Sequence, residues 1–296
     1  MARIGVIGLG NMGLPMALNL VRAGHEVWGH DRAAAAMQAL TDGGGHAATS
    51  VAEAVQAAAT VLTMLPAGAH VRAVLMEAWP HAAPDTLFID SSTIDVQTAR
   101  DGAAEAVRHG CVMLDAPVSG GAGGAAAGTL TFMVGGDPAV FERARPILAA
   151  MGRNIVLAGG PGAGQAAKVC NNLILAITML GVSEAFALAD KLGLSAQAMF
   201  DISSTSSGQC WALTSYCPVP GPVPASPANR EYQAGFATDL MLKDVSLAVD
   251  AIASTGAASV LGTAARDAYA RLSALGLGGK DFSVAAQALL EGRIGR

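Results

Sequence analysis

The sequence predicts an α/β fold, with a mostly parallel, doubly wound N-terminal sheet and an all-α C-terminal domain joined by a long interdomain helix. A strand, a glycine-rich turn, a helix and a second strand occupy residues 3–31. Short apolar runs then alternate with alanine-rich segments, which is typical of a parallel sheet covered by helices. Beyond residue 162 the pattern is helical without clear strands. We therefore expect two domains, 1–162 and 163–296.

The first strand, 3–7, runs directly into the motif Gly8-x-Gly10-x-x-Gly13. Gly8 can form the tight turn, and Gly10 has no Cβ to keep the backbone away from a pyrophosphate. Gly13 allows close packing of helix on strand. The helix N-terminus then offers N–H groups and partial positive charge to the phosphates. The motif alone is weak in a chain with 36 glycines, but its strand and helix context favours a Rossmann-like dinucleotide-binding domain.

Asp31 ends the second predicted strand, 18 residues after Gly13. A carboxylate at this place can accept hydrogen bonds from the adenosine ribose hydroxyls, and it would repel a 2′-phosphate. NAD is therefore favoured over NADP. Arg32 weakens the preference, because a neighbouring guanidinium can accommodate a phosphate, so NADP stays possible.

Polar or turn-forming residues follow two of the later strands, at the sheet edge where such folds bind ligands. Leu65 and Pro66 end one strand, and Asp90-Ser91-Ser92-Thr93 follows another with hydroxyls near the expected nicotinamide. The later strands are predicted at 60–65, 86–89, 111–114, 130–134 and 154–157.

Residues 115–121 read Asp-Ala-Pro-Val-Ser-Gly-Gly and follow the predicted strand at 111–114. The Ser119 hydroxyl and the N–H groups of Gly120 and Gly121 would form a small anion nest, for which a carboxylate is the natural guest. A flexible Gly/Ala loop through residue 128 is the alternative explanation of this composition.

A helix of roughly 29 residues is predicted from Ala163 to Lys191, long enough to span about 44 Å. It is so apolar that we expect it to cross between the domains or to lie inside an oligomer. Lys168 and Asn172 are one turn apart and share a face. Burial favours the neutral amine, which could then exchange a proton near pH 7. Alternatively, the lysine side chain extends out of the helix to water.

The C-terminal part is predicted to contain helical stretches at 236–254 and 257–275 and a short last helix after Lys280-Asp281-Phe282. Segment 215–229 holds five of the 13 prolines and cannot be a regular helix. Its neighbours Trp211 and Tyr216 suggest an ordered loop packed against the body of the protein.

Composition excludes several classes of function. A formal net charge of -5 without a Lys/Arg run argues against nucleic-acid binding. The longest apolar run, near 173–182, is too short to cross a bilayer, so we expect no membrane partner and a cytoplasmic location. The low charged fraction, 14%, suggests an oligomer, a homodimer or homotetramer.

Neither the cysteines nor the histidines form a recognisable metal or redox motif. The cysteines show no C-x-x-C spacing and are expected to be reduced thiols. The histidines are expected to be structural or exposed, and no metal is predicted. The residues concerned are Cys111, Cys170, Cys210 and Cys217, and His25, His30, His46, His70, His81 and His109.

Four motifs in order give the chain a family resemblance along essentially all of its length. They are Gly8-Leu9-Gly10-Asn11-Met12-Gly13, residues 115–121, Gly164-Gln165-x-x-Lys168-x-x-x-Asn172 and Lys243-Asp244. Together they resemble the β-hydroxyacid dehydrogenases. Within that family the chain is similar to the 3-hydroxyisobutyrate dehydrogenase branch, because of 170–172, of 206–208 leading to Trp211, and of the proline-rich loop at 216–227.

The resemblance implies a role for each matching residue. Lys168 would be the catalytic acid/base. The substrate would be held by Ser119, Gly120, Gly121 and Asn172, with Trp211, Tyr216 and Asp244 closing the substrate side. The dinucleotide would be bound by Gly8, Gly10, Asn11, Met12, Gly13, Asp31, Arg32, Leu65, Pro66, Thr93 and Lys243. His70 departs from the family pattern, which has a small polar residue near the cofactor, so its role is open.

The expected activity is NAD-dependent oxidation of 3-hydroxyisobutyrate, a small hydroxyacid of valine breakdown, to methylmalonate semialdehyde. The same acid/base mechanism fits several alternative enzymes. They are a tartronate semialdehyde reductase, an NADP-linked small aldehyde reductase, a 3-hydroxypropionate dehydrogenase and a serine dehydrogenase. A 6-phosphogluconate enzyme would need a larger C-terminal domain and a basic cluster. A dinucleotide-binding scaffold protein is the non-enzymatic alternative, but the presence of Lys168 argues against it.

Overall fold

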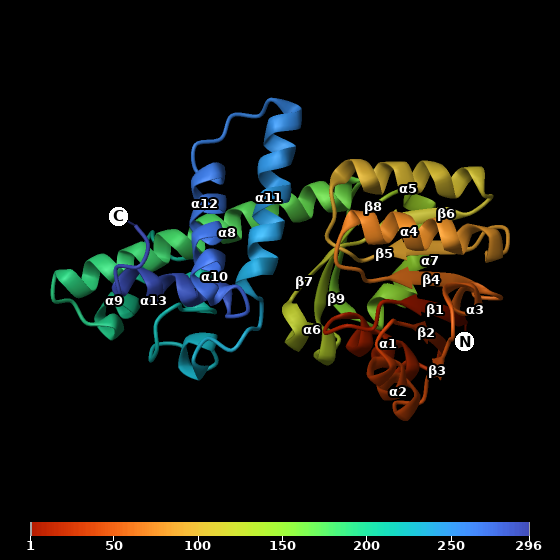
Figure 1. Ribbon diagram of the computed structural model, residues 1–296, viewed down its shortest axis with the longest axis horizontal. Helices are drawn as coiled ribbons and strands as arrows, with labels where there is room; N and C mark the ends of the chain where they lie inside the picture. The colour runs from red at the N-terminus through yellow and green to blue at the C-terminus, as the bar shows by residue number, and fades with distance from the viewer. Residues whose placement is uncertain (1, 296) are drawn as a thin grey trace. The chain divides into compact units, whose positions relative to one another are not determined.

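The computed structural model describes residues 2–295, which separate into two compact units with the division between Lys168 and Val169. The division falls inside one continuous helix, α8 (Ala163–Lys191). This is the predicted fold class, a doubly wound α/β sheet followed by a helical part, with a long helix running from the first unit into the second (Figure 1).

The first unit is built on one nine-stranded sheet with the order β3-β2-β1-β4-β5-β6-β8-β7, and β9 pairs with β8. The pairs from β3 to β6 are parallel, as are β8 and β9, whereas β8 runs antiparallel to β6 and β7. The strands are β1 (Arg3–Ile7), β2 (Glu26–His30), β3 (His46–Ala47), β4 (Thr60–Thr63), β5 (Leu87–Asp90), β6 (Val112–Asp115), β7 (Val118–Ser119), β8 (Leu130–Gly135) and β9 (Gly152–Gly159).

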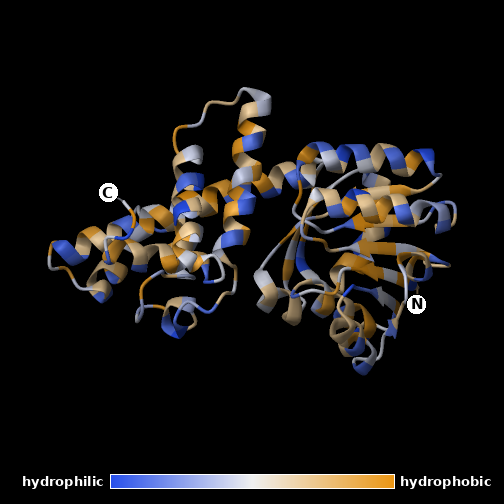
Figure 2. Cartoon of the chain, viewed as in Figure 1, coloured by the Kyte–Doolittle hydropathy of each residue, from blue (hydrophilic) through white to orange (hydrophobic). Residues whose placement is uncertain are grey.

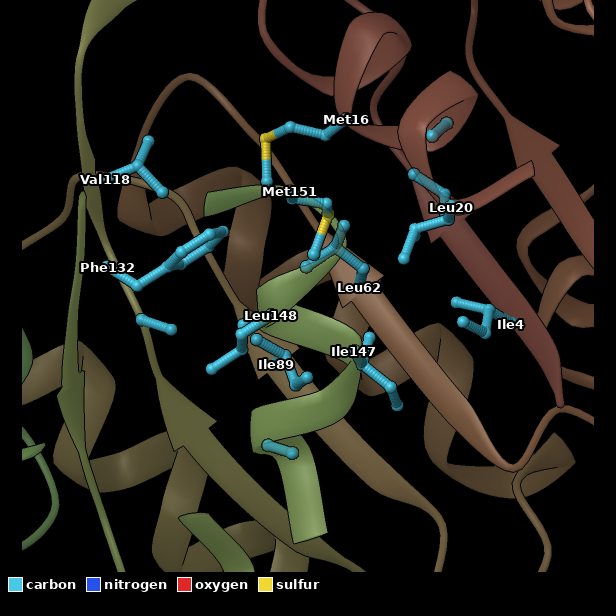
Figure 3. Close-up of a cluster of buried hydrophobic side chains, with 14 of the residues drawn as sticks. Ile4, Met16, Leu20, Leu62, Ile89, Val118, Phe132, Ile147, Leu148 and Met151 are labelled. Atoms are coloured by element: carbon cyan, nitrogen blue, oxygen red, sulfur yellow. The ribbon is translucent and has the colours of Figure 1, made fainter. Parts of the chain in front are cut away.

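Helices cover both faces of this sheet, because alternate strand residues point to opposite sides. In β5, Leu87 and Ile89 enter one core and Phe88 the other. The helices of the first core are α1 (Gly13–Arg22), α2 (Ala34–Asp42), α6 (Gly121–Ala127) and α7 (Pro138–Ala149); those of the second are α3 (Val51–Val55), α4 (Gly68–Ala78) and α5 (Val96–Arg108). Figure 3 shows part of the first core, where Met16 and Leu20 of α1 lie among Leu62, Ile89 and Phe132 from the strands.

The second unit is helical. Its main core joins α8 to the helices and turns that follow it, for example through Met179, Met241, Tyr269 and Phe282, all nearly inaccessible to solvent. After α8 come α9 (Ala196–Ser203), α10 (Trp211–Thr214), α11 (Thr238–Thr255), α12 (Gly262–Leu272) and α13 (Ala285–Leu290). Short turns of other helix types lie at Pro227–Arg230, Ser273–Leu277 and Phe282–Val284.

Helix α8 is hydrophobic along most of its length (Figure 2). By length and composition it is the one helix among residues 2–295 that could cross a membrane. The prediction that no apolar segment is long enough to span a bilayer, which considered only the run at 173–182, was therefore wrong. Its packing identifies it as a core helix instead, because Ala176, Met179 and Phe186 lie in the two main cores of the second unit.

One alternative and one helix boundary from the sequence were wrong. Residues 121–127 form helix α6, so the alternative of a flexible loop through residue 128 does not hold. The helix predicted at 257–275 begins only at Gly262, because the Ser259 hydroxyl accepts the Gly262 N–H and closes a turn ahead of it. The ordered proline-rich loop is confirmed: Cys217 and Val219 are buried, and the Tyr232 hydroxyl donates to the Pro218 carbonyl at 2.9 Å.

Candidate active site

The glycine-rich turn joins β1 to α1, and each of its glycines has a distinct surrounding. Gly8 has a φ of 93°, and a Cβ on it would lie 2.2 Å from the Met64 carbonyl oxygen. A Cβ on Gly13 would lie 1.9 Å from the Gly8 oxygen, so the start of α1 can approach the turn only without a side chain. These two glycines are therefore required by the fold itself.

Gly10 differs, because no protein atom lies within 4 Å of the place a Cβ would take. Gly10 and Asn11 are exposed, and Met12 precedes α1 without any side-chain cap or acidic residue in the first turn. The first N–H groups of a helix have no acceptors within it. An open backbone beside an uncapped helix N-terminus fits a dinucleotide pyrophosphate.

Asp31 follows β2 and is hydrogen-bonded to this turn. Its Oδ2 accepts the Leu9 N–H at 2.7 Å, and its Oδ1 accepts the Ala33 N–H at 2.8 Å. The carboxylate is half-buried, whereas Arg32 is exposed. The acid thus holds the glycine-rich turn in place in addition to the ribose-binding role predicted for it.

The loops after β4 and β5 are joined by a buried carboxylate, Asp90. Its Oδ1 accepts hydrogen bonds from the Thr63 hydroxyl at 2.8 Å and the Ser92 hydroxyl at 2.6 Å. The Ser92 Oγ in turn accepts the Leu65 N–H at 2.8 Å. This chain brings the predicted nicotinamide neighbours Leu65 and Thr93 onto adjacent loops. The hydroxyls of Thr63 and Ser92 already form hydrogen bonds within the protein.

Burial raises the pKa of Asp90 to about 6, because desolvation outweighs the hydrogen bonds that stabilise the charged form. Its Oδ2 is buried and has no hydrogen-bond partner among residues 2–295. The pKa of Asp115 is raised as well, chiefly by desolvation.

Ser119 ends β7, a two-residue strand paired with β8, and is half-buried. Gly120 and Gly121 follow with φ values of 133° and 62°, in the region that favours glycine. The backbone turns sharply there into α6, whose N-terminus has no side-chain cap. Consecutive N–H groups in such a turn can face one anion, so the residues fit the predicted carboxylate nest.

Sequence reasoning missed Asn19, a buried amide that fastens α6 to α1. Its Nδ2 donates to the Ala125 carbonyl at 2.6 Å, and Arg22 donates to its Oδ1. An asparagine on the apolar face of a helix was the available signal, because a buried amide needs partners.

Lys168 is 7% exposed, so the alternative in which it extends out of the helix to water was wrong. Asn172, one turn later on α8, is 1% exposed. Its Nδ2 donates to Asp244 Oδ2 at 2.6 Å, and Lys243 forms an ion pair with Asp244 Oδ1 at 3.2 Å. Three predicted site residues of the second unit therefore form one connected group.

Trp211 and Tyr216 also lie together, with their rings stacked at a centroid distance of 4.8 Å. The Tyr216 hydroxyl donates to Asp281 Oδ2 at 2.8 Å, and its ring stacks on Phe282. Asp281 is fully buried and also accepts the N–H groups of Gly235, Phe236 and Ser283 and the Ser283 hydroxyl. Sequence reasoning assigned Asp281 no role, although a buried acid before a short helix was a usable signal.

The other candidate side chains of the described part of the chain form no metal site or disulfide. His70 is exposed on α4, and the four cysteines are free thiols. No cluster of three potential metal ligands occurs among residues 2–295. Two surface cavities, of about 320 and 300 Å³, are lined by none of the predicted site residues.

Two family models together match nearly the whole chain. Residues 3–160 match the NAD-binding domain of 6-phosphogluconate dehydrogenase. Residues 162–289 match the domain described as the NAD-binding part of NADP-dependent 3-hydroxyisobutyrate dehydrogenase. The first unit therefore contains an NAD(P)-binding domain.

Relatives of similar length support the same assignment. A probable 3-hydroxyisobutyrate dehydrogenase of Mycobacterium tuberculosis is 53% identical over 274 residues, 93% of each chain. An NAD-dependent L-serine dehydrogenase of Pseudomonas aeruginosa is 47% identical over 287 residues, 96% of each. The solved structure of the M. tuberculosis 3-hydroxyisobutyrate dehydrogenase with L-serine has a TM-score of 0.94 at 52% identity, covering 98% of this chain and 99% of that one. The chain is an oxidoreductase that belongs to the 3-hydroxyisobutyrate dehydrogenase family of β-hydroxyacid dehydrogenases.

Proposed function

We propose that the protein oxidises the primary alcohol of 3-hydroxyisobutyrate to methylmalonate semialdehyde with NAD, and that Lys168 is the acid/base. The observation that carries the proposal is the burial of Lys168 on α8, one helical turn ahead of the buried Asn172. Burial removes this amine from bulk water one helical turn from an amide, a suitable setting for a group that exchanges a proton with a bound substrate.

The reaction moves a hydride and a proton in opposite senses. Bound NAD supplies the acceptor for the hydride from the carbinol carbon. Lys168, in its neutral form, takes the hydroxyl proton as the C–O bond becomes a carbonyl, and returns a proton when the reaction runs in reverse.

The substrate carboxylate is proposed to bind at Ser119, through the serine hydroxyl and the N–H groups of Gly120 and Gly121. Their left-handed backbone and the uncapped start of α6 support this placement. Asn172 would orient the substrate, and Asp244 holds the Asn172 amide in one rotamer. Trp211 and the ring of Tyr216 would close the substrate side.

For the dinucleotide, we propose that Gly8, Gly10 and Gly13 with Asn11 and Met12 surround the pyrophosphate. Asp31 would accept the ribose hydroxyls, favouring NAD over NADP, with Arg32 beside it. Leu65, Pro66 and Thr93 would border the nicotinamide, and Lys243 would reach the cofactor. The open backbone at Gly10 and the hydrogen-bonded loops after β4 and β5 support these roles.

L-Serine is the second candidate substrate. It differs from 3-hydroxyisobutyrate in carrying an amino group in place of the methyl group, and the relatives described above include an L-serine dehydrogenase and a structure with L-serine. Asp244 supplies a carboxylate, already bonded to Asn172 and Lys243, that suits an ammonium group. Tartronate semialdehyde and 3-hydroxypropionate enzymes remain alternatives within the same chemistry.

Two measurements test the proposal. A panel of 3-hydroxyisobutyrate, 3-hydroxypropionate, L-serine and glycerate with NAD and NADP, followed at 340 nm, should give the highest kcat/KM for 3-hydroxyisobutyrate with NAD. A higher kcat/KM for L-serine would select the second candidate, and no turnover of any of them would leave the scaffold alternative.

Lys168→Ala should lower kcat about 100- to 10,000-fold, the usual contribution of an acid/base, while NADH still binds. The matched control is Lys191→Ala at the far end of the same helix, where the lysine side chain is 75% exposed. Near-normal turnover of the Lys168 variant would refute the mechanism.

We further propose functional domains at 1–162 and 163–296, a cytoplasmic location and a homodimer or homotetramer. Exposed apolar side chains along and just after α8, Ile174, Leu188 and Leu192, support self-association. Light scattering of the purified protein measures the oligomeric state.

A further inference from the structure

We propose that Gln165 is a positioning residue, which fixes the Lys168 turn of α8 against the loop that carries Thr93. The proposal rests on the proposed function, because it assigns Gln165 an effect on the chemistry through Lys168. Gln165 is fully buried three residues before the lysine. All the contacts that follow lie within the first unit.

The side chain of Gln165 brackets Thr93. Its Nε2 donates to the Ser92 carbonyl at 2.7 Å, and its Oε1 accepts the Ile94 N–H at 3.1 Å. One amide thus pairs with the backbone groups on both sides of a single residue, as a neighbouring strand would. Because the donor and the acceptor ends each have their own partner, only one orientation of the amide satisfies both.

The backbone of Gln165 is fixed independently. Its N–H donates to Asp115 Oδ2 at 2.8 Å, and the Gly162 N–H donates to Asp115 Oδ1 at 2.7 Å. Asp115 therefore caps the first turn of α8 from the end of β6. A Cβ on Gly164 would lie 2.4 Å from the Met133 carbonyl oxygen, so the turn also packs directly on β8.

These contacts leave the first turn of α8 little freedom relative to the sheet. Ser92 continues the connection through its hydroxyl to Asp90 and to the Leu65 N–H. The loops proposed to border the nicotinamide and the helix turn that presents the proposed acid/base are therefore joined through one glutamine side chain. A displacement of about 1 Å at a reacting group can cost about 100-fold in rate, so we expect Gln165 to matter for kcat.

The test compares Gln165→Met, which keeps the length but removes both hydrogen bonds, with Gln97→Met as the matched control. Gln97 is an exposed glutamine on α5 that bonds Asp101. Gln165→Met should lower kcat about 10- to 100-fold and leave the Kd for NADH nearly unchanged. In the unliganded protein, it should speed amide hydrogen exchange at Ile94 about tenfold or more, because that N–H loses its acceptor. The control should change none of these quantities.

A double-mutant cycle separates positioning from general destabilisation. In a Lys168→Ala background, Gln165→Met should lower kcat by less than about threefold, because the group it positions is gone. A full further loss in that background would show a merely structural role and overturn the proposal, as would unchanged kcat and unchanged Ile94 exchange in the single variant.

Gln165→Asn keeps the amide but shortens the side chain, and it takes the place of Gln165→Met if that variant does not fold. The same losses are then expected, and their absence overturns the proposal. Near-normal turnover of Lys168→Ala alone refutes the proposed function and removes the link from Gln165 to the chemistry. In that case Ile94 exchange still shows whether the glutamine fixes the Thr93 loop.

Discussion

The carboxylate of Asp31 accepts the backbone N–H of Leu9 at 2.7 Å, although the two residues are 22 positions apart. The acid that is proposed to choose the cofactor is therefore also a structural support of the turn that is proposed to bind it. A substitution at Asp31 changes both functions at once, and the choice of substitution decides whether they can be separated.

Asp31→Asn and Asp31→Ser separate cofactor choice from turn support. Both remove the negative charge that repels a 2′-phosphate, so the ratio of NADP to NAD affinity should rise about tenfold or more. Only the asparagine retains an oxygen at the right length to accept the Leu9 N–H, so Asp31→Ser should also lower the Tm. Fluorescence titration with NADH and NADPH measures the affinities. An unchanged affinity ratio in both variants would contradict the assigned role of the acid.

Gly10→Ala and Gly13→Ala should have opposite consequences. The added methyl group at Gly13 meets the Gly8 oxygen at 1.9 Å, so the variant should lose about 1 to 3 kcal/mol of unfolding free energy or fail to fold. At Gly10 the methyl group meets no protein atom, so the Tm should stay the same while NADH binding weakens. Thermal melts and NADH titrations check both. A Gly10 variant with normal NADH affinity would contradict pyrophosphate binding at this turn.

Asp90→Asn should change how stability depends on pH. Because burial raises the pKa of Asp90 to about 6 from 3.8, its titration favours the folded state below pH 3.8, and this contribution is lost as the pH rises to about 6. The neutral amide cannot ionise and does not lose this contribution. The free energy of unfolding of the variant should therefore rise relative to that of the wild type between pH 4 and 7, by up to about 3 kcal/mol. Urea unfolding of both proteins across this range measures the difference. A difference that does not vary with pH would show that Asp90 ionises normally.

Tyr216→Phe should affect stability more than catalysis. The Tyr216 hydroxyl is bonded to Asp281, so its removal should cost about 1 to 2 kcal/mol and leave kcat/KM within about threefold. Asp281→Ala removes the acceptor of five hydrogen bonds and should cost more, about 3 kcal/mol or above. Chemical denaturation with steady-state kinetics distinguishes the two effects. A large fall in kcat/KM for Tyr216→Phe at normal stability would place the hydroxyl on the substrate instead.

The sequence predicted best those features that local chemistry determines. The turn from Gly8 to Gly13 could be recognised because the spacing of its glycines between a strand and a helix is a local pattern. Helix α8 ends at the predicted residues because its apolar pattern is continuous. Helix α6 was missed because a run of glycine and alanine has no apolar periodicity. The start of α12 was misplaced because 257–261 is apolar enough to resemble helix.

Pairings between distant segments could not be derived in the same way. Asn172 and Asp244 were both named, but their hydrogen bond joins positions 72 residues apart and depends on how α8 and α11 pack. Gln165 belongs to the motif that contains Lys168 and Asn172, but the sequence assigned it no role. Its partners Ser92 and Ile94 are more than 70 residues away and are known only from the fold. Spacing along a helix shows which residues share a face, but not what that face meets.

The Asn19–Ala125 hydrogen bond limits how this chain can be recombined with its relatives. A crossover anywhere between residues 22 and 121 takes α1 from one parent and α6 from the other. If the donor of α1 lacks an amide at position 19, the buried Ala125 carbonyl loses the Asn19 donor and keeps only the Gly128 N–H at 3.4 Å, at a cost of about 1 kcal/mol. Crossovers after Gly128 inherit both residues from one parent, and chimeras built there should retain the proposed carboxylate nest that begins α6.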